Sequence, residues 1–152
     1  MKIGISACLI GDMCTYKGSS NLIEELRSLD VEWVKICPEV MGGLSIPRDP
    51  AEIISTDPLK VVSVKGNDET DQYVQGSHKA LALLLKEDVH CVLTKNNSPS
   101  CGSNTIYDGT FSHTVIEGNG VFVSLAKEKG LTIFTEKQLD EFYTYIKEHR
   151  YE

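Results

Sequence analysis

The stretch Lys2-Ile3-Gly4-Ile5-Ser6-Ala7-Cys8 holds the pattern on which the fold prediction rests. Its two isoleucines alternate with small residues, which predicts a short buried β-strand that ends at the cysteine. The same arrangement recurs twice along the chain. A predicted strand over residues 31–36 runs into Cys37, and a predicted strand over residues 90–94 runs into a loop that contains Cys101.

Apolar residues at helical spacing follow several of the predicted strands. Helices are expected over residues 21–30, from Asp68 or Thr70 onward, over residues 121–129 and over residues 136–149. A fourth strand is expected over residues 131–134, a β-hairpin over residues 51–55 and 60–65, and loops over residues 40–50 and 107–120. Because strands alternate with helices, the sequence predicts an α/β fold with a three-layer, mainly parallel, Rossmann-like sheet and a β-hairpin insertion. The whole chain, residues 1–152, is expected to form one domain.

The chain of 152 residues carries a formal net charge of -7, and its lysines are interspersed with acidic residues. This balance disfavours a nucleic acid as the main partner, since phosphate backbones are bound by basic surfaces. The longest apolar run, residues 80–85, is far too short to span a bilayer, so no membrane association is expected. The N-terminus shows no long apolar segment of a signal peptide, so we expect a cytoplasmic protein with a small-molecule substrate. No pattern predicts the oligomeric state.

Five cysteines in a chain without a predicted secretory signal argue for metal binding or catalysis rather than for a disulfide framework. Cys8, Cys37 and Cys101 each follow a predicted parallel strand, and the carboxyl ends of such strands meet at the edge where α/β proteins build their sites. We therefore expect these three thiols to lie close together. Cys91, within a strand, is expected in the core. Cys14, in the loop after Cys8, stays open as a fourth ligand, a sulfur relay or a bystander.

Three converging thiols indicate a soft-metal site, because thiolates select zinc, copper(I) or iron–sulfur clusters. Zinc commonly takes histidine as well, but His78 and His149 fall on predicted helices and His90 begins a strand. Only His113 lies in a loop that could return to the site. An iron–sulfur cluster with three protein thiolates leaves one iron free for a substrate, an arrangement that suits an enzyme rather than an electron carrier.

Short motifs spread over nearly the whole chain are highly specific in combination. They are Ser6-Ala7-Cys8-Leu9-Ile10-Gly11, Cys37-Pro38-Glu39-Val40, Gly42-Gly43-Leu44, Pro47-Arg48, Ser98-Pro99-Ser100-Cys101-Gly102-Ser103, Tyr107-Asp108-Gly109-Thr110-Phe111 and residues 118–121. Together they strongly resemble the thiouracil desulfidase family. The resemblance implies a [4Fe-4S] cluster held by Cys8, Cys37 and Cys101. It also implies that the unique iron takes the sulfur from a thiolated pyrimidine such as thiouracil, and that water replaces it at carbon without net redox change.

Four polar residues near these cysteines are candidates for catalysis and substrate binding. Glu39, in the turn after the second strand, is expected to activate water as a general base, or alternatively to cap a neighbouring helix or to pair with Arg48. Ser98 and Ser100 are expected to donate protons or hydrogen bonds to the leaving sulfur, although serines also stabilise turns. Arg48 is expected to orient a uracil carbonyl or a phosphate, or else to form a structural salt bridge.

Two other functions stay open on the sequence alone. One is an iron–sulfur or sulfur-carrier protein that binds its cargo without turnover. The other is a zinc-dependent or cluster-free thiol hydrolase with Cys101 as nucleophile. Glu39 and the two serines favour catalysis, since a carrier needs neither an acid nor a base. Trp33 and Tyr73 fall on periodic apolar positions and are expected to pack in the core rather than to stack on a substrate.

Overall fold

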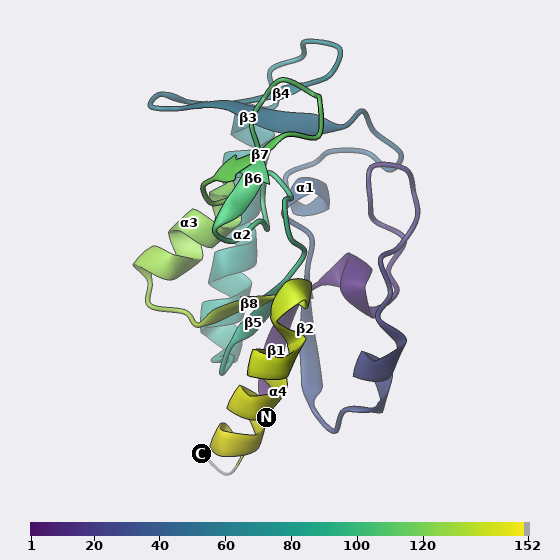
Figure 1. Ribbon diagram of the computed structural model, residues 1–152, viewed down its shortest axis with the longest axis vertical. Coiled ribbons are helices and arrows are strands. Elements are labelled where there is room, and N and C mark those ends of the chain that lie inside the picture. Colours follow the sequence, from purple (N-terminus) through teal and green to yellow (C-terminus); the bar gives the residue numbers. More distant parts are fainter. Residues whose placement is uncertain (151–152) are drawn as a thin grey trace.

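A central parallel sheet organises the molecule (Figure 1). The computed structural model describes residues 1–150. The sheet has the order β2-β1-β5-β8, and every neighbouring pair is parallel. Its strands are β1 (Lys2–Ser6), β2 (Glu32–Ile36), β5 (Val92–Thr94) and β8 (Ile133–Thr135). The predicted α/β class and mainly parallel sheet are confirmed, and each of the four strands lies where the sequence places it.

Helices cover both faces of this sheet and complete three layers. α2 (Thr70–Glu87) and α3 (Val121–Glu128) pack on one face, where they enclose an apolar cluster with β2, β5 and β8. α4 (Leu139–His149) packs on the other face. Among residues 1–150, none of these helices combines the length and the apolar character needed to cross a bilayer.

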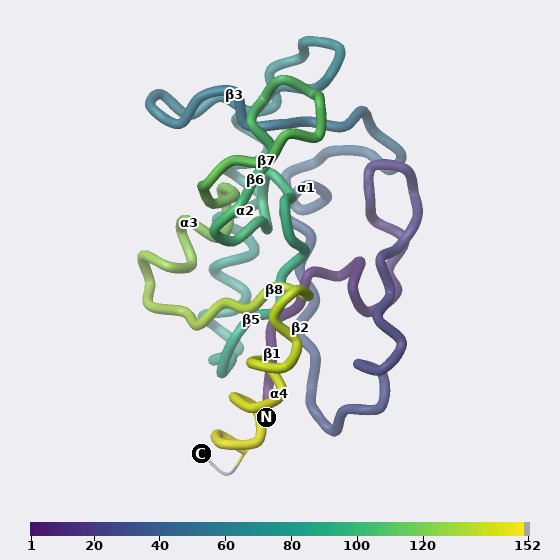
Figure 2. Tube along the Cα trace, in the orientation of Figure 1, coloured from purple at the N-terminus to yellow at the C-terminus, as the bar shows by residue number. Residues whose placement is uncertain are grey.

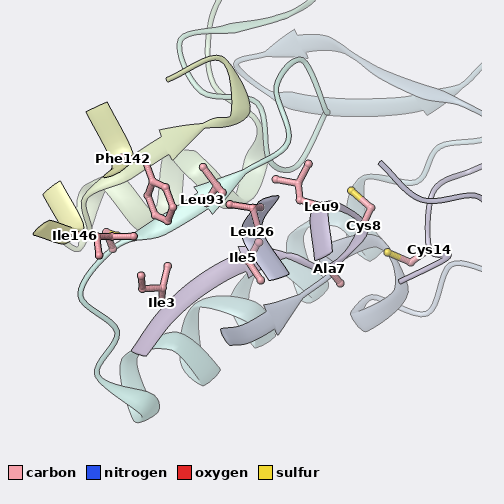
Figure 3. Packing of buried hydrophobic residues seen from close by; sticks show 11 residues of the cluster. Ile3, Ile5, Ala7, Cys8, Leu9, Cys14, Leu26, Leu93, Phe142 and Ile146 are labelled. Atoms are coloured by element: carbon pink, nitrogen blue, oxygen red, sulfur yellow. The ribbon is translucent and has the colours of Figure 1, made fainter. Parts of the chain in front are cut away.

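The first strand shows how the sequence selects its two faces. Ile3 and Ile5 are fully buried and pack with Phe142 and Leu26 in one cluster. Because alternate residues of a strand point to opposite faces, Gly4 turns toward α2 instead. Figure 3 shows this cluster, with Cys8 at one end of it, where the strand has ended. The apolar core therefore leads directly to the first of the predicted site residues.

Two antiparallel hairpins lie beyond the carboxyl ends of the sheet strands (Figure 1). The first, β3 (Ala51–Thr56) with β4 (Leu59–Ser63), is the predicted insertion. The second pairs β6 (Thr105–Tyr107) with β7 (Val115–Glu117). The sequence predicts a loop over residues 107–120, which is wrong for Tyr107 and for β7. Its strands have three residues each and β7 is exposed throughout, so no apolar alternation marks them.

The predicted helix over residues 21–30 is also wrong. Only a 3-10 helix, η2 (Glu24–Ser28), forms there. Asn21 does not act as a helix cap, because its amide donates to the Cys8 sulfur at 3.4 Å and its backbone N–H donates to the Cys8 carbonyl at 2.9 Å. These bonds tie Asn21 to η1 (Ala7–Ile10), the 3-10 helix that follows β1.

A one-turn helix, α1 (Pro38–Met41), replaces the start of the predicted loop over residues 40–50. It packs against α2 with the two backbones in direct contact. A Cβ atom added at Gly76 would lie 1.7 Å from the Pro38 carbonyl oxygen, and one added at Gly42 would lie 1.9 Å from the Gln72 carbonyl oxygen. Only glycine permits this approach, and the contact fixes the orientation of α1.

Candidate active site

A pocket of about 390 Å³ opens at the carboxyl edge of the sheet. Strand order reverses at β1, whose neighbours β2 and β5 lie on opposite sides, and α/β proteins bind ligands at such a position. The wall comes from segments far apart in the chain. Figure 2 shows the loop after β1, in purple, and the hairpin segments, in blue and green, that lie beyond the sheet.

Four of the five cysteines line this pocket. Cys8 lies in η1, directly after β1, and Cys37 lies between β2 and α1. Cys101 lies in the loop that follows β5. These three are the cysteines that the sequence predicts to converge, and the order β2-β1-β5 places their strands side by side. Cys14, from the loop after Cys8, joins them.

The thiol of Cys14 stands between two of the other thiols. Its thiol can donate hydrogen bonds to the thiolates of Cys8 and Cys37, which lowers the pKa of both Cys8 and Cys37, because a donor stabilises a thiolate. The same bonds raise the pKa of Cys14, which holds its proton. Asn21 donates a further hydrogen bond to Cys8 at 3.4 Å. The pocket thus favours thiolates at Cys8 and Cys37.

Cys101 and Cys91 lie in different surroundings. Burial raises the pKa of the Cys101 thiol, and the nearby Glu39 carboxylate raises it further. The Ser100 hydroxyl, 3.5 Å from the Cys101 sulfur, acts in the opposite direction. Cys91 does not line the pocket and is fully buried in the core, as predicted. Burial raises the pKa of Cys91 to about 12.

Glu39 is buried at the pocket wall, where it forms a network with both predicted serines. Its Oε1 accepts hydrogen bonds from Ser100 at 2.6 Å and from Ser98 at 3.4 Å. Its Oε2 lies 3.8 Å from the Cys37 sulfur. The alternative pairing of Glu39 with Arg48 does not form in the part of the chain that the structure describes.

Ser98 also organises the loop that carries Cys101. Its hydroxyl oxygen accepts hydrogen bonds from the backbone N–H groups of Ser100 at 3.2 Å and of Cys101 at 3.1 Å. Ser98 therefore has the turn-stabilising role that the sequence left open, in addition to its bond to Glu39. Ser100 is fully buried. The two serines join the carboxylate of Glu39 to the loop of Cys101.

Arg48 lines the pocket and is hydrogen-bonded to the loop that carries Cys14. Its guanidinium donates to the carbonyl oxygen of Cys14 at 3.0 Å and to that of Ser45 at 3.2 Å. These are bonds to carbonyl groups rather than the structural salt bridge that the sequence left open. Two bonds leave some of the five guanidinium N–H groups for a substrate.

Several pocket residues escape the sequence reasoning. Lys95 and Glu52 lie in the wall, although nothing in their spacing marks them. Tyr73 is buried in the core as predicted, but it also forms part of the wall. His113 reaches the pocket from the loop between β6 and β7, as the sequence allowed. A signal for Glu52 would have required the second hairpin, because Glu52 is hydrogen-bonded to the loop of that hairpin.

The side chains that line the pocket indicate whether it suits a single metal ion or an iron–sulfur cluster. Within residues 1–150, no group of three His, Cys, Asp or Glu side chains is arranged to hold a single metal ion. Four thiols facing one pocket are soft ligands, which suit iron–sulfur clusters. A cluster is larger than a single ion, so its ligands stand further apart than those of a mononuclear site. The residues present therefore fit a cluster better than a single zinc ion.

Comparison with known proteins identifies the family. The sequence model of the family described as 2-thiouracil desulfurase matches residues 3–138. The chain belongs to this desulfurase family. The uncharacterized protein YbbK of Bacillus subtilis (strain 168) is 40% identical over 146 residues, which cover 90% of this chain and 97% of YbbK. A solved structure of the [4Fe-4S]-dependent thiouracil desulfidase TudS (DUF523Vcz) matches with a TM-score of 0.86 and 36% identity, covering 96% of this chain and 97% of the TudS chain.

Membership of the 2-thiouracil desulfurase family confirms the resemblance found in the sequence motifs and assigns the chain to a family of desulfidase enzymes. The match to TudS also confirms the fold class. The [4Fe-4S] cluster that the motifs imply is the cofactor named for TudS. The roles of individual residues in this chain rest on the geometry described above.

Proposed function

We propose that this protein removes the sulfur of a thiolated pyrimidine such as thiouracil in a hydrolytic, non-redox reaction that depends on a [4Fe-4S] cluster. The observation that carries the proposal is one pocket that combines four thiols with a buried Glu39–Ser100 pair. Thiols supply soft ligands and the carboxylate supplies a base. Membership of the 2-thiouracil desulfurase family supports the same reaction.

Cys8, Cys37 and Cys101 are the ligands in this proposal. Each follows a different one of three neighbouring parallel strands, so the three residues lie at the same edge of the sheet and line the same pocket. Cys14 stays protonated beside Cys8 and Cys37, and we give it no bond to iron. When bound, a cluster with three protein ligands supplies one iron atom free to accept sulfur.

Glu39 acts as the general base. Oε1 is held by Ser98 and Ser100, while Oε2 faces the cysteine side of the pocket. Oε2 takes a proton from the attacking water as its oxygen bonds to the carbon that carries sulfur. The hydroxyl group of the adduct loses the second proton as the carbonyl forms and the carbon–sulfur bond breaks. Both protons leave with the sulfur, so thiouracil and water give uracil and hydrogen sulfide with no electron gained or lost.

The two serines and Arg48 orient the reacting groups. The one hydroxyl proton of Ser100 is donated to Glu39, and the same hydroxyl lies 3.5 Å from the Cys101 sulfur. In the reaction this proton would turn from Glu39 toward the leaving sulfur. Ser98 holds the loop that carries both Ser100 and Cys101. The free N–H groups of Arg48 bind the carbonyl oxygen of the pyrimidine, as an arginine fork commonly does with planar acceptors.

A cluster-free thiol hydrolase fits the site less well. A nucleophilic cysteine needs a lowered pKa, whereas burial raises the pKa of Cys101. The five free thiols also suit a reducing compartment, and we place the protein in the cytoplasm. The acidic net charge of -7 favours a small substrate over a nucleic acid.

The test is an anaerobic assay of reconstituted protein with thiouracil. We expect one uracil and one sulfide for each thiouracil consumed, without added reductant or oxidant. Protein without the cluster is the control and should release no sulfide. A fully loaded protein that binds sulfide or thiouracil but releases no uracil would favour the carrier function.

A further inference from the structure

Glu52 on β3 is a second buried carboxylate in the pocket wall. The residue is only 8% exposed. Its Oε1 accepts hydrogen bonds from the backbone N–H groups of Gly109 at 2.9 Å and of Phe111 at 3.1 Å. These two bonds hold the loop between β6 and β7 against the first hairpin, and both end on the same oxygen atom.

The other oxygen of this carboxylate is available. Oε2 has no hydrogen-bond partner within residues 1–150. It is not among the fully enclosed side-chain atoms without partners, which in the described residues belong to Glu69, Ser77 and His90. Glu52 is a residue of the pocket wall, and because Oε2 is not enclosed it is accessible to a ligand. An accessible carboxylate oxygen is met by water, and a bound ligand with a suitable N–H group can replace that water.

The proposed substrate, a thiolated pyrimidine, carries hydrogen-bond donors that suit this oxygen. A thiolated uracil carries ring N–H groups next to its thiocarbonyl carbon, and a carboxylate can only accept hydrogen bonds. We infer that Oε2 of Glu52 accepts a hydrogen bond from a ring N–H of the thiolated pyrimidine. This inference rests on the proposed function and adds a specificity determinant at a site apart from Glu39 and the cysteines.

Such a contact selects among related bases. A pyrimidine with an acceptor nitrogen or an N-methyl group at the position that faces Glu52 leaves the carboxylate oxygen unpaired. Sites built to bond a substrate N–H reject analogues that lack it more strongly than apolar pockets reject a methyl group. The protein should therefore discriminate between bases by the protonation and substitution of one ring nitrogen.

The variant Glu52→Gln separates substrate binding from loop anchoring. An amide keeps Oε1 as acceptor for Gly109 and Phe111 but replaces Oε2 by a donor. Binding is measured anaerobically on cluster-loaded protein by calorimetry with uracil, 1-methyluracil and 3-methyluracil, which are not consumed. Turnover is measured with 2-thiouracil. Glu117→Gln, an exposed carboxylate on β7, is the matched control.

In the wild type, one of the two methyl groups should weaken binding about tenfold or more, as expected for a lost bond to a charged group. In Glu52→Gln, uracil itself should bind about 10- to 100-fold more weakly, and the methyl effect should fall below about threefold. KM for 2-thiouracil should rise while kcat changes little. Glu117→Gln should match the wild type.

Unchanged uracil binding by Glu52→Gln, or equal binding of all three uracils by the wild type, would overturn the inference. So would weakened binding accompanied by a large gain in the hydrogen-exchange rates of the Gly109 and Phe111 amides, because the loop would then have been released and Glu52 would act only as its anchor. If the wild type releases sulfide in any of these cases, the proposed function stands. If the loaded wild type releases none from any thiolated pyrimidine, the proposed function itself fails.

Discussion

The hydroxyl of Ser100 donates a 2.6 Å hydrogen bond to Oε1 of Glu39, and both residues are buried. This bond joins α1, after the second sheet strand, to the loop that carries Cys101, after the third. The same hydroxyl lies 3.5 Å from the Cys101 sulfur. A candidate base and a candidate cluster ligand therefore share one side chain, which makes their positions interdependent.

Replacing Glu39 by Gln should leave the cluster in place and remove the base. Gln keeps the shape and an acceptor for Ser100, so the visible spectrum of the cluster should survive. Turnover of thiouracil should fall by about two to four orders of magnitude, the usual contribution of a general base. Ser100→Ala should have a smaller effect. Full activity of Glu39→Gln would assign the base to another residue.

Each of the three proposed ligands should be needed for the cluster. Anaerobically prepared protein should be brown with about four iron atoms per chain, and Cys8→Ala, Cys37→Ala and Cys101→Ala should each lose most of this iron. Cys91→Ala is the matched control, because that thiol is buried in the core away from the pocket. Iron analysis and absorption spectra measure the outcome. Equal loss of iron in Cys91→Ala would refute the ligand assignment.

Cys14 should be dispensable for holding the cluster without oxygen, and it should form a disulfide once air has removed the cluster. Cys14→Ala should keep its iron under anaerobic conditions, because Cys14 is not a ligand in our proposal. After cluster loss in air, the Cys14 thiol lies close enough to Cys8 and Cys37 to form a disulfide with one of them. Peptide mapping after exposure to air should find this bond in the wild type. Loss of iron from anaerobic Cys14→Ala would make Cys14 a ligand.

Gly76→Ala should destabilise the fold, although a helix is normally more stable with alanine than with glycine by about 0.5–1 kcal/mol. The added Cβ would overlap the Pro38 carbonyl of α1, and overpacking of this kind costs about 1–3 kcal/mol. Urea unfolding measures the change. Gln75→Ala, on the exposed side of the same helix, should shift stability by less than about 0.5 kcal/mol. A stabilised Gly76→Ala would show that α1 can move away freely.

The sequence predicts the sheet and the convergence of three cysteines well, because short apolar runs mark the strands and a cysteine follows three of the four. It fails for residues 21–30, where bonds from Asn21 to Cys8 override helical spacing. It also misses β6 and β7, whose short exposed strands carry no periodicity. Glu52 is missed for the same reason, since its partners lie on the loop of that hairpin.

The dispersion of the proposed ligands over β2, β1 and β5 has a consequence for biogenesis. A Cys-x-x-Cys motif can capture metal while the rest of a chain is still unfolded, but these three thiols meet only when the strands have paired. The complete set of ligands would then exist only once β2, β1 and β5 have paired, so the cluster and the sheet should stabilise each other. A chain that ends before Cys101 would lack one of the three ligands and should not hold the cluster.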